Sequence, residues 1–257
     1  MKTTTIRIAG LDLELFETGQ GPALLFLHGG QGFNSAQPFV APLAGQRRLL
    51  VPSHPGFGKS SLPDWLDSVD DIAHLYLELL DRLDLAAVDV VGCSIGGWIA
   101  AEMATKAPER IRRLVMVGPV GVKVGSPDKL DIPDIFAMSQ DDAAAVLFHD
   151  PARMKPDIAQ MSDDELTAMV RGRETLALLT WEPWMHNPKL KHRLHRVAMP
   201  ALFVRGESDG LVSAPYMQAY ARLLPKSRTA TIAAAGHAPQ LEQPQAFAST
   251  VLAFLEE

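Results

Sequence analysis

The fold is decided by residues 88–104, which read VDVVGCSIGGWIAAEMA. The apolar run at the start of this stretch indicates a buried strand, and the apolar residues after Gly97 indicate a helix. Between the two lies GCSIG, residues 92–96, which has the pattern G-x-S-x-G where a strand turns sharply into a helix. Such a turn strains the serine backbone and points its hydroxyl out over the end of the sheet. Ser94 is therefore a candidate nucleophile.

Length and composition permit an enzyme with this turn but do not select one. The 257 residues favour one α/β domain with an insertion over two independent domains. The chain is 47% hydrophobic and 21% charged, which indicates a globular protein, and its net charge of −6 argues against a nucleic-acid binder. No apolar run approaches the roughly 20 residues that span a bilayer, and the first residues lack the apolar stretch of a secretory signal. We therefore expect a cytoplasmic protein that does not associate with a membrane.

Strand-like and helix-like segments alternate along most of the chain. Apolar runs predict the strands, and apolar residues at helical spacing predict the helices. This alternation indicates a mostly parallel, doubly wound sheet. The predicted strands are residues 5–8, 11–17, 23–27, 48–51, 88–91, 114–117, 202–204 and 229–232, and further helices are predicted at 69–83, 214–224 and 243–255.

The alternation stops between residues 121 and 197. This stretch has no clear strand and carries acidic, helix-like pieces at Asp131–Met138 and Asp163–Thr180. An insertion of this size between two core strands predicts a helical cap over the active end of the sheet. The predicted core is therefore residues 1–120 and 198–257, with residues 121–197 as the cap.

A serine nucleophile needs a base, and the base needs an acid that orients it. In folds with this serine turn, the acid and then the histidine follow the serine along the chain. Asp209 follows the predicted strand 202–204, and His237 follows the last predicted strand. Both lie in loops at the carboxyl ends of strands, where open α/β sheets bind ligands. Glu207 is the alternative acid, but it lies closer to the end of its strand than Asp209, which we favour.

The oxyanion of a tetrahedral intermediate needs two hydrogen-bond donors. One is expected to be the backbone N–H of Ile95, the residue after the nucleophile. The other is expected from HGGQG, residues 28–32, where Gly30 is favoured because a glycine lets backbone and substrate approach closely. Gln31 and Gly32 are the alternatives, and glycines that only shape a turn are another interpretation.

Five further residues are candidates for the substrate pocket, with packing inside the cap as the alternative role for those that lie in the insertion. They are Gly29, Phe136, Trp181, Trp184 and Met185.

These motifs together resemble those of the α/β-hydrolase superfamily, over essentially the full length of the chain. In the family's order they are HGG at 28–30, GFGKS at 56–60, GCSIG at 92–96, Gly206-x-x-Asp209-x-x-Val212, and Gly236-His237. The resemblance implies the α/β-hydrolase fold, with an eight-stranded, mostly parallel sheet whose second strand is antiparallel, helices on both faces and a helical cap. It also implies a Ser94–His237–Asp209 triad. One departure is SHPG at 53–56, where many members have an Asp-x-x-Gly or Asp-x-Arg-Gly run.

Other conspicuous residues are expected to play supporting roles. Cys93, the only cysteine, occupies an x position of the serine motif and is expected to fill space under the turn. His28 is expected to brace the glycine loop. The segment at 56–60 lacks the first glycine of a phosphate-binding loop, which argues against a nucleotide site. No metal site is expected from the histidines at 149, 186, 192 and 195, the last three of which are assigned to a solvated basic helix.

We therefore expect a serine hydrolase that cleaves a small or medium carboxylic ester through an acyl-enzyme, as in capped esterases and meta-cleavage-product hydrolases. No cofactor is expected, and the expected partner is a small-molecule substrate, with a homodimer as one arrangement that the sequence allows. Two alternatives remain open. One is hydrolysis of a carbon–carbon bond in vinylogous diketo acids, and the other is a non-catalytic receptor for a small ligand on the same fold.

Overall fold

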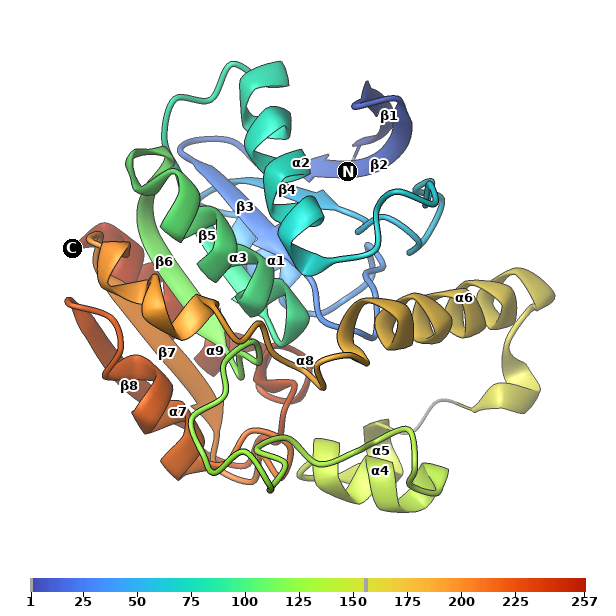
Figure 1. The fold of residues 1–257 in the computed structure, drawn as a ribbon. Helices are drawn as coiled ribbons and strands as arrows, with labels where there is room; N and C mark the ends of the chain where they lie inside the picture. Colours follow the sequence, from blue (N-terminus) through green and yellow to red (C-terminus); the bar gives the residue numbers. More distant parts are fainter. Residues whose placement is uncertain (1, 155–156) are drawn as a thin grey trace.

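The computed structural model describes residues 2–154 and 157–257, which form one eight-stranded sheet with helices on both faces (Figure 1). The strand order is β1-β2-β4-β3-β5-β6-β7-β8. Strand β2 runs antiparallel to β1 and β4, and the pairs from β4 to β8 are parallel. The predicted sheet, with its antiparallel second strand, is confirmed. The strands are β1 Lys2–Ile8, β2 Leu11–Thr18, β3 Ala23–Leu27, β4 Arg48–Pro52, β5 Val88–Cys93, β6 Ile111–Val117, β7 Ala201–Gly206 and β8 Ser227–Ile232.

The helices fall into those of the core and those that lie between β6 and β7. The core helices are α1 Val40–Ala44, α2 Val69–Arg82, α3 Ile95–Lys106, α7 Ala214–Ala221, α8 Pro239–Glu242 and α9 Pro244–Glu256, with the 3₁₀ turn η1 Pro108–Arg110. Between β6 and β7 lie α4 Gln140–Leu147, α5 Pro151–Met154, η2 Ile158–Gln160, α6 Asp163–Thr180, η3 Leu190–His192 and η4 Leu194–Arg196.

Alternate residues of the central strands point to opposite faces of the sheet. In β3, Leu25 and Leu27 join a core that α2, α3 and α7 cover, whereas Leu24 and Phe26 join a core that α1 and α9 cover. All four of these side chains are at most 1% exposed. A strand buried on both faces reads as a continuous apolar run, which is why the sequence predicted β3 with its observed bounds.

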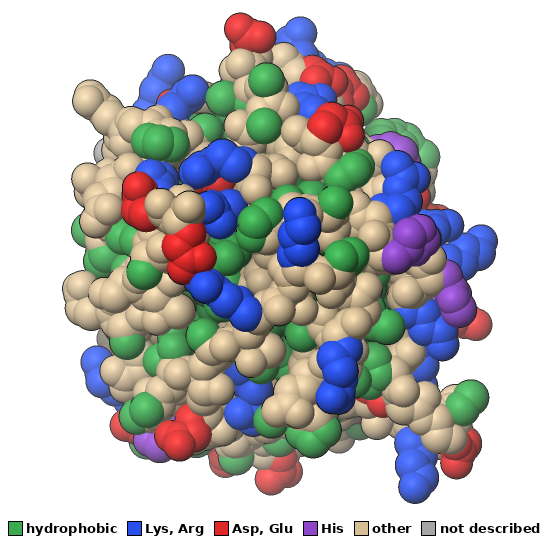
Figure 2. Space-filling view, turned by 90° about the vertical axis from the view of Figure 1, so that its left-hand side faces the viewer, with side chains coloured by type: hydrophobic (Ala, Val, Ile, Leu, Met, Phe, Trp, Pro, Cys, Tyr) green, Lys and Arg blue, Asp and Glu red, His purple; other side chains and the backbone are tan. Residues whose placement is uncertain are grey.

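The surface carries mixed charges. Figure 2 shows Lys and Arg side chains interspersed with Asp and Glu across one face, among small hydrophobic patches. The net charge of −6 is therefore not gathered into a patch of one sign on this face. Within the described residues, no helix combines the length and the apolarity needed to cross a membrane.

Residues 121–197, here named the insertion, contain no strand in their described part. Helix α6 has the bounds that the sequence predicted. It begins with a capping box, in which the Ser162 hydroxyl accepts a hydrogen bond from Glu165 N and the Glu165 carboxylate accepts one from Ser162 N. Helices α4, α5 and α6 lie on one side of the sheet, beyond the ends of β6 and β7 (Figure 1).

The predicted helix at Asp131–Met138 is wrong, because this segment consists of turns and bends. Pro133 disfavours a helical conformation of the residue before it and has no N–H to donate. The Asp131 carboxylate accepts hydrogen bonds from Val124 N and Gly125 N, and Asp134 Oδ1 accepts from Phe136 N at 3.0 Å. Short acidic side chains stabilise turns in this way and compete with a helix.

The predicted basic helix near the end of the insertion is also wrong. The chain forms two 3₁₀ turns there, η3 and η4, and exposes His192 and His195. Leu190 and Leu194 are fully buried. These two leucines anchor the turns to the core, while the basic residues between them face solvent.

Candidate active site

Ser94 lies between β5 and α3 in a strained backbone conformation. Its φ is +52° and its ψ is −115°, values that a residue with a Cβ rarely adopts. Ser94 N donates to Val117 O of β6 at 2.8 Å, and Ser94 O accepts from Gly97 N at 3.0 Å. The neighbouring strand and the first turn of α3 therefore hold this conformation.

Two glycines allow the strand and the helix to meet at this turn. A Cβ on Gly92 would lie 2.3 Å from Gly96 O, and a Cβ on Gly96 would lie 2.2 Å from Leu27 O. No side chain fits at either position, so only glycine allows this close approach. Cys93, between them, is 3% exposed and packs into the core that α1 and α9 cover. Burial raises the pKa of the Cys93 thiol well above its usual range, so this thiol stays protonated.

Asp209 and His237 come together from the loops after β7 and β8. His237 Nδ1 lies 3.0 Å from Asp209 Oδ2. The other oxygen, Asp209 Oδ1, accepts hydrogen bonds from Leu211 N at 2.9 Å and Val212 N at 2.8 Å. The Asp209 carboxylate is therefore held by its own loop on one side and contacts the imidazole of His237 on the other.

The geometry leaves the second imidazole nitrogen free. An ionised carboxylate only accepts hydrogen bonds, so Nδ1 carries the proton and Nε2 is the basic atom. His237 Nε2 is buried and has no hydrogen-bond partner among the described residues. The alternative acid, Glu207, is exposed, and its carboxylate accepts only a long hydrogen bond of 3.5 Å from Ala234 N among the described residues.

The glycine loop after β3 approaches Ser94. A Cβ on Gly29 would lie 3.4 Å from the Ser94 Cβ. Gly32 N donates to Gly29 O at 3.0 Å, so this N–H is already engaged, which leaves Gly30 favoured over Gly32 as a donor. Ile95 is the first residue of α3, and its N–H is among those that a helix leaves without an internal partner.

Two buried histidines, His28 and His54, contact the backbone of this loop. His28 Nδ1 lies 2.7 Å from Gly29 O, and His28 Nε2 accepts from His54 N at 3.0 Å. His54 Nε2 lies 2.8 Å from His28 O, and its Nδ1 lies 2.5 Å from the Tyr76 hydroxyl. Burial lowers the pKa of His28 to about 4 and that of His54 well below its usual value, so both rings are neutral near pH 7. The sequence pointed to His28 as a brace but missed His54, which occupies the departure from the family pattern.

Helix α6 of the insertion lies over the glycine loop and the loop after β4. A Cβ on Gly30 would lie 2.5 Å from Leu176 Cδ2, so this leucine covers Gly30. Thr175 Oγ1 donates to Gly56 O at 3.2 Å, and Arg171 donates to Gly58 O at 2.9 Å. The sequence predicted the helix but not these residues, because nothing in its pattern indicates which face meets the glycines.

The other four candidate pocket residues lie in the insertion. Phe136, Trp181 and Trp184 form an aromatic cluster with ring centroids 5.7 to 6.4 Å apart. Trp181 is 58% exposed, whereas Met185 is 4% exposed. Of the five candidates, Gly29 approaches Ser94 most directly within the described residues.

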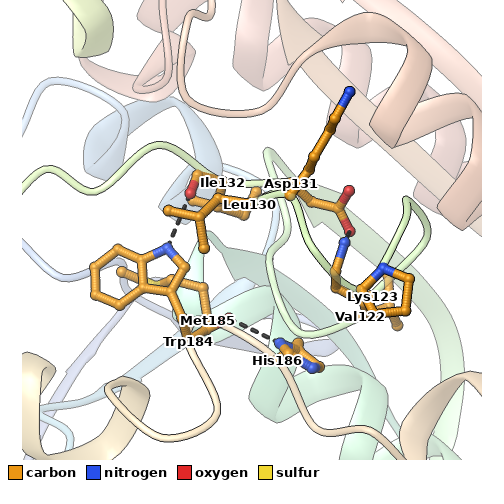
Figure 3. Close-up of a pocket in the computed structure, with 10 residues that line it drawn as sticks. Val122, Lys123, Leu130, Asp131, Ile132, Trp184, Met185 and His186 are labelled. Atoms are coloured by element: carbon orange, nitrogen blue, oxygen red, sulfur yellow. Dashed lines mark hydrogen bonds and ion pairs between the residues drawn. The ribbon is translucent and has the colours of Figure 1, made fainter.

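Trp184 and Met185 line a small cavity of about 80 Å³, whose lining lies within residues 122–132 and 184–186 of the insertion (Figure 3). Four of its polar side chains have partners within the protein. Trp184 Nε1 donates to Ile132 O, His186 Nδ1 lies 2.8 Å from Trp184 O, and Lys123 pairs with Asp131. Ser94, Asp209 and His237 do not line this cavity. The described residues contain no group of three or more metal-ligating side chains that could hold an ion.

Comparisons with known proteins agree with this architecture. The chain matches the Alpha/beta hydrolase family over residues 24–250. The pimeloyl-(acyl-carrier protein) methyl ester esterase of Nitrosomonas europaea is 29% identical, over 90% of this chain and 95% of that protein. The 2-hydroxymuconate semialdehyde hydrolase of a Pseudomonas species is 28% identical, over 97% of this chain and 92% of that protein.

Two further matches are a much longer protein and a solved structure. The polyketide synthase ThaQ of Burkholderia thailandensis is 29% identical over 96% of this chain, but the chain spans only 12% of that protein. The crystal structure of a meta-cleavage product hydrolase, CumD, superposes with a TM-score of 0.77 at 21% identity, covering 98% of this chain and 97% of that one. At this identity the structural likeness concerns the fold alone. The family match over most of the chain, together with the sheet and the strained serine turn, establishes that this chain belongs to the alpha/beta hydrolase family.

Proposed function

We propose that this hydrolase cleaves a small or medium carboxylic ester, with Ser94 as nucleophile, His237 as base and Asp209 as the acid that orients the base. One observation carries the proposal. The Asp209–His237 contact leaves a buried Nε2 without a partner among the described residues, in a chain whose serine occupies the strained turn after β5. A buried imidazole nitrogen that lacks a partner is costly, and such costs are concentrated at functional sites.

The proposed reaction has two steps. Ser94 Oγ attacks the carbonyl carbon and its proton passes to His237 Nε2, while the N–H groups of Ile95 and Gly30 stabilise the oxyanion. The imidazolium then protonates the leaving alkoxide, which departs as an alcohol and leaves an acyl-serine. Water, activated by His237, attacks the acyl carbon and releases the carboxylic acid and the free serine.

We infer further that the insertion, residues 121–197, acts as the cap that shapes the acyl pocket. Leu176 over Gly30 supports this role, because it places an apolar side chain beside the proposed oxyanion donors. Two arginines in α6 already have partners within the protein, which favours an ester over a diketo acid as the substrate. Arg171 donates to two backbone carbonyls, and Arg173 stacks on the ring of Phe136, so both cations already have partners. Cleavage of a diketo acid would need a cationic or polar group to bind the substrate carboxylate.

Hydrolysis of a carbon–carbon bond is the second candidate, favoured by the similarity to 2-hydroxymuconate semialdehyde hydrolase over nearly the full chain. A side-by-side assay of an aryl ester and a dienone acid separates the two. We expect a higher kcat/KM on the ester. Faster cleavage of the dienone acid would replace the ester proposal with the second candidate.

Labelling tests the nucleophile directly. We expect a fluorophosphonate probe to form an adduct on Ser94 in the folded wild-type protein, and Ser94→Ala to abolish both the adduct and esterase turnover. Ser213→Ala is the matched control, because Ser213 is the N-cap of α7 and lies outside the proposed triad. An adduct on another residue would refute the assignment. No adduct, combined with tight binding of one small ligand, would favour a receptor on the same fold.

A further inference from the structure

The end of α4 is hydrogen-bonded to the two loops that carry the proposed acid and base. We name them the acid loop, residues 207–213 after β7, and the base loop, residues 233–238 after β8. Gly210 N, next to Asp209, donates to Val146 O at 3.0 Å. His237 N donates to Leu147 O at 2.6 Å. The backbone of the insertion is therefore attached to the two loops whose relative position decides the Asp209–His237 contact.

Three glycines permit this close packing. A Cβ on Gly210 would lie 2.8 Å from Val146 O, and a Cβ on Gly236 would lie 2.4 Å from Leu147 O. A Cβ on Gly206 would lie 2.0 Å from Gly236 O. A side chain on Gly210 or Gly236 would push the loop that carries it away from the end of α4, and a side chain on Gly206 would push the end of β7 away from the base loop.

Glu242 in α8 connects the same segments through its side chain. Its Oε2 accepts a hydrogen bond from Gly236 N at 2.6 Å, directly before His237. Its Oε1 accepts hydrogen bonds from His149 N at 2.8 Å and Asp150 N at 3.2 Å, in the turn after α4. One carboxylate thus uses both oxygens to join the base loop to the insertion, and hydrogen bonds to a charged acceptor are the stronger kind.

Two further contacts support this junction. Ala144, Phe148 and Ala238 form a small buried apolar cluster beneath it. His149 Nδ1 lies 2.8 Å from Ser208 Oγ in the acid loop. The turn after α4 therefore contacts the acid loop, the base loop and α8 together.

We propose that Glu242 is a positioning residue, which keeps His237 aligned with Asp209 and Ser94 by holding the base loop against the end of α4. The inference rests on the proposed function of His237. Displacing a catalytic group by about 1 Å can cost around 100-fold in rate, so the loss of this carboxylate should affect the chemical step more than substrate binding.

Three variants test the role of Glu242, each assayed with an aryl ester. Glu242→Ala is expected to lower kcat by about 10- to 100-fold and to change KM less than about twofold. Glu242→Gln is expected to lie between the wild type and the alanine variant, because its amide oxygen accepts on one side while its NH₂ group faces an N–H donor on the other. Glu109→Gln, an exposed change on η1, is the matched control and is expected to behave as wild type.

Amide hydrogen exchange supplies a readout that does not depend on turnover. The N–H groups of His237 and Asp150 are expected to exchange faster in Glu242→Ala than in the wild type, with unchanged rates in Glu109→Gln. Circular dichroism confirms that each variant is folded. Unchanged kcat in folded Glu242→Ala, or a rise in KM alone, would overturn the inference. A wild type without turnover or labelling would instead refute the proposed function, and amide exchange would still decide whether Glu242 holds the base loop.

Discussion

Asp209 is held more tightly than any other side chain of the proposed triad. Two backbone N–H groups of its own loop bind one carboxylate oxygen, and the imidazole of His237 binds the other. The carboxylate is 0% exposed. Its acceptor sites face donors on both sides, so the proton of His237 stays on Nδ1 and Nε2 stays basic. The strained Ser94 is held by backbone contacts alone in the described structure, which leaves its hydroxyl available.

Replacing the acid tests this arrangement at the scale of one residue. Asp209→Asn is expected to lower kcat by about 10⁴-fold, because the amide NH₂ stabilises the wrong tautomer of His237. Glu207→Gln makes the same chemical change in an exposed side chain two residues away and is expected to leave kcat within about twofold. Steady-state kinetics on one aryl ester measures both variants. Equal losses in the two variants would contradict the assignment of Asp209.

At the scale of elements, α6 shows which features of a helix the local sequence predicts and which it does not. The sequence predicted its bounds from an acidic, helix-like stretch, and the structure adds the capping box at Ser162 and Glu165 that fixes its start. The face that meets the glycine loops could not be predicted, since it depends on where the sheet places Gly30 and Gly56. The helix predicted at Asp131–Met138 was wrong for a local reason. Its acidic, helix-like composition indicated a helix, but Pro133 and the turn-forming carboxylates of Asp131 and Asp134 outweighed it.

Leu176 and Leu178 provide a matched pair on α6. Leu176 covers Gly30, whereas Leu178 is 54% exposed. Leu176→Ala is expected to open space beside the glycine loop and to raise kcat/KM for a branched acyl ester by about tenfold relative to the acetyl ester. Leu178→Ala should leave that ratio unchanged. The ratio is measured with two aryl esters that share one leaving group. No difference between the two variants would show that Leu176 does not shape the acyl site.

At the scale of the whole molecule, the buried histidine pair links stability to pH. The folded-state pKa of His28 is lowered to about 4, and that of His54 is also lowered, whereas an unfolded histidine titrates near 6.5. Below pH 6.5 the unfolded chain therefore binds more protons than the folded one, and stability falls as the pH falls. Above pH 6.5 both states are neutral at these positions and the contribution is constant.

This linkage predicts a decrease in the free energy of unfolding between pH 7 and pH 5. Each buried histidine contributes up to about 1.4 kcal/mol per pH unit below its unfolded pKa. His54→Gln is expected to be less stable than the wild type at pH 7, because it disturbs the contacts of the His54 ring with the Tyr76 hydroxyl and with His28 O, and to lose less stability on acidification. His195→Gln replaces an exposed histidine and should keep the wild-type pH dependence. Urea unfolding at the two pH values measures this, and equal pH dependence in all three proteins would rule the linkage out.

The sequence by itself determined the eight-stranded sheet, the strained serine turn and the loops that carry Asp209 and His237. These features depend on signals that can be read along the chain. They are the apolar runs, the glycines at points where two backbone segments approach closely, and the order of the motifs. Tertiary structure alone decided that Leu176 covers Gly30, that His54 stands behind the glycine loop, and that Glu242 joins the base loop to α4. Each of these contacts joins segments far apart in the chain, and no local periodicity encodes which side chain reaches which distant backbone group.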